Sequence, residues 1–250
     1  MGRIDMMKPS VRIVTHIHST DLPQYGVFLR AQLSSLIIHK SSKVDTYVTV
    51  CCTESDERSM EVLDEFQELL GDRLFIYKMT PERLFRRAIG RNAEALSCVE
   101  DLIWFADADY VFGSNCFNTL LKGYHDIQHL NPTMIWPKYV QKQSNHADGD
   151  VFWQKNIDTK GLLDIKENLF FQFRYRRPIG GVQIIPKAIA NKYGYLNEGH
   201  DKWQKSVKRQ SFGCFRDDPK ATSFAGKIGE VLSVPVDNVF RLRHTKTSYQ

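Results

Sequence analysis

An apolar run that ends in two aspartates constrains the fold of this chain more than any other stretch. Residues 102–106 read LIWFA, and Asp107, Ala108 and Asp109 follow directly. An apolar run without polar alternation is typical of a strand buried on both faces, in the middle of a parallel α/β sheet. Ligands of such sheets bind beyond the carboxyl ends of the strands. The two aspartates are therefore expected at a binding site.

The spacing of the two aspartates suggests a cation. Side chains alternate along a strand, so Asp107 and Asp109 can point the same way across the small Ala108. Two carboxylates at a strand end are costly unless something positive neutralises them. Mg²⁺ typically takes one or two carboxylates together with substrate phosphate oxygens. The alternative is that both aspartates only cap the following turn.

Strand-like and helix-like segments alternate over the first 110 residues. Strands are expected at 11–17, 44–52, 74–79 and before Asp107, and helices at 27–38, 56–70 and from Thr80 onward. This β-α alternation predicts a parallel sheet with helices on both faces. Asn92 falls on the apolar stripe of the third helix, where a buried amide needs a hydrogen-bond partner.

The second half of the chain is less regular. We expect a helix at 116–130, a strand at 134–140, a long loop or lid at 141–177, a strand after Gly180 and Gly181, helices at 187–194 and 220–227, and a short strand at 239–244. Within the loop, residues 166–177 (KENLFFQFRYRR) read either as a partly buried strand or as an acceptor-binding surface. The sequence contains no repeat and no evident linker, so a single domain is favoured.

Charge and cysteine content limit the possible partners and compartment. The formal net charge is +5 and the pI is about 8.9, which suits an anionic ligand, although a solvated surface without a special partner is the alternative. Five cysteines without a framework spacing fit a reducing compartment. There is no signal-like segment and no transmembrane-length apolar run. We therefore expect a cytoplasmic protein, with peripheral attachment to a membrane as the alternative.

Four blocks in order resemble the inverting glycosyltransferases of the GT-A fold, in their family-2-like group. The blocks are Gly90-Arg91-Asn92 through Asp107-Ala108-Asp109, Pro178-Ile179-Gly180-Gly181 with 193–198 (YGYLNE), Asp217-Asp218, and 240–244 (FRLRH). The resemblance covers about residues 11–246. It implies a single GT-A, Rossmann-like domain over 1–250, with a nucleotide-sugar-binding half at 11–110, the loop or lid at 141–177, and an acceptor-side and catalytic half at 178–246.

The resemblance also implies an activity and roles for individual residues. The activity is transfer of a sugar, with inversion, from a nucleotide-diphosphate sugar such as a UDP-sugar to a hydroxyl acceptor. Asp109 and His244 would bind the metal, and Asp107 would reach the metal through water or bind the donor ribose. Thr15, Asp56, Arg91 and Asn92 would bind the donor, and Gly180 and Gly181 would lie on the acceptor side. Asp218 would be the general base, with Asp217 as the second candidate for that role. A mixed oxygen and histidine site favours Mn²⁺ over Mg²⁺.

Each of these assignments has a structural alternative. Asp217 and Asp218 could be solvated residues at a helix N-terminus, where the dipole favours them. His244 could be a surface histidine of the tail, and Asn92 could simply satisfy backbone groups.

Two other functions and several acceptors remain open at this point. A sugar-phosphate nucleotidyltransferase usually carries a glycine-rich loop after its first strand, whereas residues 19–26 hold one glycine. A non-catalytic nucleotide-sugar-binding module would keep Asp107 and Asp109 but would not need Asp218. The acceptor could be a glycan, a lipid-linked sugar, a protein or a modified DNA base. The phenylalanines and arginines of 166–177 suit phosphate contacts with base stacking, and equally an acidic polysaccharide or a lipid diphosphate.

Overall fold

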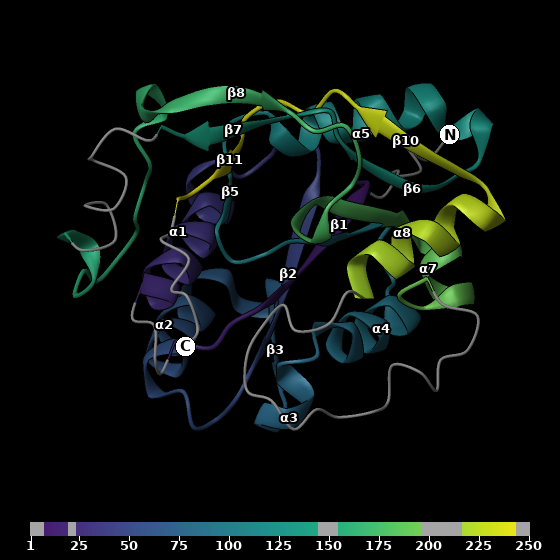
Figure 1. Ribbon diagram of the computed structural model, residues 1–250. Helices are drawn as coiled ribbons and strands as arrows, with labels where there is room; N and C mark the ends of the chain where they lie inside the picture. Colours follow the sequence, from purple (N-terminus) through teal and green to yellow (C-terminus); the bar gives the residue numbers. More distant parts are fainter. Residues whose placement is uncertain (1–7, 20–23, 145–154, 197–216, 244–250) are drawn as a thin grey trace, which may run out of the picture.

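A seven-stranded sheet forms the centre of the molecule (Figure 1). The computed structural model describes residues 8–19, 24–144, 155–196 and 217–243. The strands of this sheet, in spatial order, are β10 (Glu230–Val234), β6 (Pro132–Pro137), β9 (Gln183–Pro186), β4 (Leu102–Phe105), β1 (Ser10–His16), β2 (Asp45–Cys52) and β3 (Leu74–Lys78). The pairs from β4 through β1 and β2 to β3 are parallel, as predicted. Strand β9 runs antiparallel to β4 and β6, which the β-α alternation did not predict.

Helices cover both faces of the central sheet, and each face has its own apolar core. On one face lie α1 (Gln24–Ile38), α2 (Glu57–Leu70) and α5 (Cys116–Ile127). On the other lie α3 (Pro81–Leu84), α4 (Arg87–Ser97), α7 (Lys187–Tyr193) and α8 (Asp217–Ile228). Strand β4 serves both cores, because Trp104 packs in the first and Ile103 and Phe105 in the second. This confirms the prediction of a strand buried on both faces.

A second, four-stranded sheet lies beside the first (upper left in Figure 1). Its spatial order is β5 (Tyr110–Phe112), β11 (Val239–Arg241), β7 (Tyr139–Gln143) and β8 (Phe170–Arg174). Strand β5 begins three residues after Asp107, so the chain passes from one sheet to the other at the two aspartates. The described residues also form four short 3₁₀ helices: Gly71–Arg73, Gln128–Leu130, Glu167–Leu169 and Gly180–Val182.

Three of the predicted elements differ from those observed. The strand expected at 134–140 is two strands, β6 and β7, which belong to different sheets. They separate at Lys138, whose amide donates to the carbonyl of Val234. The helix expected from Thr80 is divided into α3 and α4, because Arg86 has the non-helical backbone angles φ −97° and ψ 81°. Part of the loop expected at 141–177 is strand β8, as the strand interpretation of 166–177 predicted.

Within the ranges that the structure describes, no helix has both the length and the apolar character to span a bilayer.

Candidate active site

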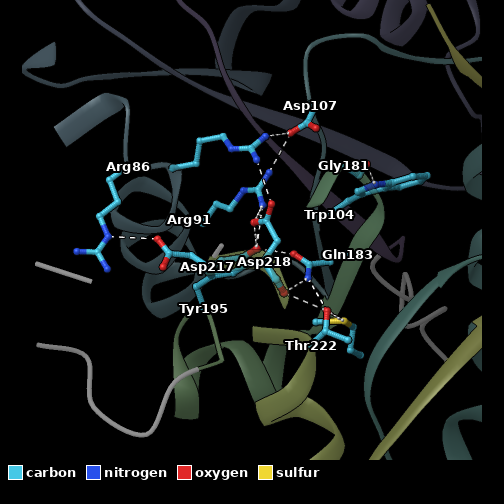
Figure 2. Close-up of polar contacts among 12 residues, drawn as sticks. Arg86, Arg91, Trp104, Asp107, Gly181, Gln183, Tyr195, Asp217, Asp218 and Thr222 are labelled. Carbon is cyan, nitrogen blue, oxygen red and sulfur yellow. Dashed lines mark hydrogen bonds and ion pairs between the residues drawn. The ribbon is translucent and has the colours of Figure 1, made fainter. Parts of the chain in front are cut away.

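Two arginines of α4 join two aspartates that are far apart in the sequence. Arg87 and Arg91 are one helical turn apart and therefore share a face of α4. Asp107 follows β4, and Asp218 is the second residue of α8. Figure 2 shows Arg91 between Asp107 and Asp218. Asp107 lies just beyond the carboxyl end of β4, where a ligand site was expected.

The ion pairs of this cluster are short and mostly buried. Arg91 is fully buried; its Nη1 lies 2.6 Å from Asp218 Oδ1 and its Nη2 lies 3.2 Å from Asp107 Oδ1. Arg87 Nη2 lies 3.0 Å from Asp218 Oδ2, and Arg87 Nη1 donates to Asp107 Oδ1. Each carboxylate thus contacts both guanidinium groups. The cluster carries two positive and two negative charges, which balance.

Tyr195 and Gln183 complete the surroundings of Asp218. The hydroxyl of Tyr195 donates to Asp218 Oδ1 at 2.6 Å and accepts a hydrogen bond from Arg91 Nη1 at 2.8 Å, and it also contacts Gln183 Oε1. Gln183 Nε2 donates to the carbonyl oxygen of Asp218 at 3.0 Å. Both the side chain and the backbone of Asp218 are therefore fixed, as Figure 2 shows.

The charge state of Asp218 follows from these neighbours. Burial by itself would raise the pKa of Asp218, but the charges of Arg91 and Arg87 and the Tyr195 hydrogen bond outweigh burial and lower it below its ordinary value. Burial raises the pKa of Tyr195 well above its ordinary value, so the phenol keeps its proton. At neutral pH the site therefore holds an ionised carboxylate with a neutral phenol beside it.

The predicted glycine pair allows the carboxylates to approach the backbone. A Cβ on Gly180 would overlap Asp218 Oδ2 and lie 2.8 Å from Asp218 Cγ. A Cβ on Gly181 would overlap the ring of Tyr110 and lie 3.1 Å from Asp107 Oδ2. The pair was predicted to precede a strand and to lie on the acceptor side; in the structure it accommodates both aspartates.

For the transferase activity that the sequence resemblance implies, with Asp218 as its base, we expect Gly180→Ala to reduce the rate about a hundredfold, since displacing a reacting group by about 1 Å can cost that much. The added methyl group has no room unless the carboxylate of Asp218 shifts. Gly226→Ala is the matched control, because a Cβ there meets nothing nearer than 4.0 Å. Steady-state transfer rates measure the effect. Equal rates for the two variants would show that Asp218 need not occupy its observed position.

Asp109 has a different arginine partner from Asp107. Asp109 is only 4% exposed, and its Oδ2 lies 2.9 Å from Nε of Arg241 in β11. Strand β4 ends at Phe105, and the amide of Tyr110 donates to the carbonyl of Asp107 across a turn. Because the strand does not continue, its alternation does not apply to this pair. The two carboxylates are held by arginines of different elements.

Three of the predicted donor-binding residues, Thr15, Asp56 and Asn92, are buried. Asp56 is the N-cap of α2 and accepts from Ser59, and it also accepts from the amide and hydroxyl of Ser19. Asn92 Oδ1 accepts from the amide of Tyr195 at 3.0 Å, so this amide satisfies a backbone group. The hydroxyl of Thr15 is buried and has no hydrogen-bond partner among the described residues. Donor binding by these residues stays a prediction.

The reserve base and the predicted histidine ligand are placed differently. Asp217 is buried at the start of α8, and its Oδ2 lies 3.2 Å from Arg86 Nε (Figure 2). It therefore contacts a different arginine from Asp218. His244 lies outside the described residues.

Four residues of the site were not predicted: Arg87, Gln183, Tyr195 and Arg241. Arg87 could have been found from its position one turn before Arg91 in a segment expected to be helical, and Tyr195 and Arg241 lie within the blocks that carry the resemblance.

The described residues offer a divalent cation carboxylate oxygens but not a complete set of protein ligands. Among the described residues, no three His, Cys, Asp or Glu side chains gather closely enough to hold a metal. The side chain of Asp107 is 30% exposed and that of Asp109 is 4% exposed. Asp107 is thus the more accessible of the two, and a cation there would compete with Arg87 and Arg91.

The fold is that of the GT-A class. Neither a family model nor a curated protein matches the sequence. Among solved structures, GalNAc-T7 with UDP, GalNAc and Mn²⁺ has a TM-score of 0.62 and 15% identity, over 97% of this chain and 45% of that one. S. aureus TarS 1–349 in complex with UDP has a TM-score of 0.55 and 14% identity, over 94% and 60%. A longer S. aureus TarS structure has a TM-score of 0.55 and 13% identity, over 95% and 37%. The chain therefore spans less than two thirds of each of these proteins.

Proposed function

We propose that this chain is a glycosyltransferase that moves a sugar, with inversion, from a UDP-sugar to a hydroxyl acceptor. The observation that carries the proposal is the ionised Asp218, fixed beside Asp107 at the ligand-binding edge of a GT-A sheet. The solved structures that share the fold support the choice of donor, because two of them contain UDP. A binding module would not require a carboxylate so closely positioned.

The proposed reaction is a single displacement. The acceptor hydroxyl gives its proton to a carboxylate oxygen of Asp218 while its oxygen forms a bond to the anomeric carbon of the sugar. The bond between that carbon and the diphosphate breaks on the opposite face, and the electron pair leaves with the diphosphate. Attack opposite to the leaving group gives inversion.

Positive groups are needed where the diphosphate leaves. Arg87 is suited to this role, because its guanidinium group contacts Asp107 and Asp218 and its side chain is 21% exposed. Preorganised charge of this kind stabilises a developing anion. We also propose that a divalent cation, Mn²⁺ or Mg²⁺, binds here and that Asp107 is one of its ligands. When bound, such a cation supplies Lewis-acid stabilisation of the diphosphate.

A nucleotide-sugar screen tests the proposal. We expect UDP-sugars to raise the melting temperature, and Mn²⁺ to enlarge the rise, because a ligand of the folded state stabilises by mass action. Asp107→Asn should remove the Mn²⁺-dependent part, whereas Asp72→Asn, on the exposed turn after α2, should keep it. UDP release with the best donor should then be measured. Binding without turnover under every acceptor condition would favour a non-catalytic module, and no binding of any nucleotide-sugar would contradict the proposal.

A further inference from the structure

One row of side chains crosses the whole second sheet from the site to its outer edge. The register pairs Tyr110 of β5 with Arg241 of β11, Arg241 with Lys142 of β7, and Lys142 with Phe171 of β8. Residues directly opposite one another on paired strands share a face of the sheet. With strands about 4.8 Å apart, the row is about 14 Å long.

Each of the two cations of the row contacts an aromatic ring. The guanidinium carbon of Arg241 lies 5.5 Å from the ring centre of Tyr110. Lys142 Nζ lies 3.3 Å from the ring centre of Phe173 and 5.3 Å from that of Tyr175. Cations over ring faces are attracted to them. The side chains of the row are therefore held in place by contacts with one another and with neighbouring rings on one face of the second sheet.

The inner end of the row meets the candidate active site, and the outer end is exposed. Tyr110 packs against Gly181, which in turn borders the carboxylate of Asp107. At the other end, Phe171 is 48% exposed and Phe173 is 38% exposed. Large apolar rings exposed side by side are informative, because they are not needed for the core.

The charge of the surface is suited to an anion. Burial, followed by the charge of Arg241, lowers the pKa of Lys142 from its ordinary value, and no carboxylate contributes to the shift. Two exposed arginines, Arg176 and Arg177, follow the strand, whereas Arg174 ends β8 on the face opposite to Phe171 and Phe173. None of them makes an ion pair with another described residue. The surface therefore offers positive charge that the described chain leaves uncompensated.

We propose that this row binds single-stranded nucleic acid, with the bases on Phe171 and Phe173 and the phosphates on Lys142 and the following arginines. Single strands are bound by a cationic track with aromatic platforms, and every base has a face that can stack. Phe171 and Phe173 are two residues apart, about 6.7 Å along the strand. The idea that this nucleic acid is the sugar acceptor rests on the proposed transferase function, whereas the binding of the nucleic acid does not.

The row fits a nucleic acid better than an anionic polysaccharide. The hydroxyl groups of a polysaccharide need directed polar partners. Phenylalanine has none, and the hydroxyls of Tyr110 and Tyr175 are within 3.2 Å of each other and so are already paired. The row presents ring faces and cations, which match bases and phosphates.

The test is fluorescence anisotropy of a labelled oligothymidylate of about 12 nucleotides, a length within the usual site sizes, without donor or metal. We expect binding that weakens with salt. Phe171→Ala should weaken it at least about fivefold, the lower end for loss of one stacked base. Lys142→Ala should lower the slope of log affinity against log salt by about one. Leu69→Ala and Lys40→Ala are the matched controls, on exposed residues away from the row.

Three outcomes would overturn the proposal. The first is no oligonucleotide binding at 50 mM salt, where phosphate contacts are strong. The second is an equal loss of affinity in the control variants and in the row variants. The third is dextran sulfate binding that is tighter than oligonucleotide binding and equally sensitive to Phe171→Ala, which would assign the row to a polysaccharide. The UDP-sugar screen on the unaltered protein is separate. If no UDP-sugar binds but the oligonucleotide does, the nucleic-acid site stands and only its role as the sugar acceptor is lost.

Discussion

Asp218→Asn should lower the rate of sugar transfer by a factor of about 10²–10⁴, the range typical of a lost general base. Asparagine keeps the shape of the side chain and can still accept from Arg91 and Tyr195, which now contact Oδ1 of Asp218. It cannot take the proton of the acceptor hydroxyl. UDP binding, measured by calorimetry, should therefore change far less than the transfer rate.

Asp217→Asn distinguishes the two candidate bases. Its partner is Arg86, 3.2 Å away, and not the Arg87 and Arg91 pair. We expect this variant to lose less activity than Asp218→Asn under the same conditions. The reverse order would assign the base to Asp217, and two fully active variants would contradict carboxylate base catalysis from this helix.

The pH dependence of Asp218 has a definite sign. Its pKa in the folded protein is below the ordinary value of 3.8, so its ion pairs contribute fully above pH 3.8. That contribution is lost only as the pH falls through the lower folded pKa. The transfer rate should therefore show no decline between pH 7 and pH 5 that depends on Asp218, and the residual rate of Asp218→Asn should have the same profile there.

Apolar runs and the alternation of β and α segments were enough to predict the parallel part of the central sheet. The apolar run at 102–106 can only be satisfied by burial on both sides, and Trp104 and Phe105 do pack in opposite cores. The parallel strands β1 to β4 follow from the same alternation of β and α segments. The glycine pair at 180 and 181 marked a close approach because no other residue fits there.

The arrangement of the site depended on contacts that no local pattern encodes. Asp107 and Asp218 meet through Arg87 and Arg91 across more than a hundred residues of chain. The expected common direction of Asp107 and Asp109 came from extending a strand past Phe105, where it in fact ends, so their joint role stays a prediction. The second sheet pairs β5, β7, β8 and β11 from widely separated segments, and such pairings are not visible in sequence periodicity.

Arg91→Met should reduce the free energy of unfolding by about 3–5 kcal/mol, the usual cost of removing one partner from a buried ion pair. Arg91 is fully buried and contacts Asp218, Asp107 and Tyr195. Methionine can fill much of the space but leaves both carboxylates with Arg87 alone. Urea denaturation monitored by circular dichroism measures the loss. Arg73→Met is the control, because Arg73 makes no ion pair among the described residues.

The effect should also be coupled to Asp218. If the loss arises from an uncompensated buried charge, Asp218→Asn in the Arg91→Met background should cost less than in the native protein, because the charge is then removed from both sides. Contacting residues in one network typically show interaction free energies of about 0.5–3 kcal/mol in such a double-mutant cycle. Additive losses would mean that the 2.6 Å contact between Arg91 and Asp218 does not stabilise the fold. In that case the low pKa of Asp218 would have to come from Arg87, which is the other cation that faces it.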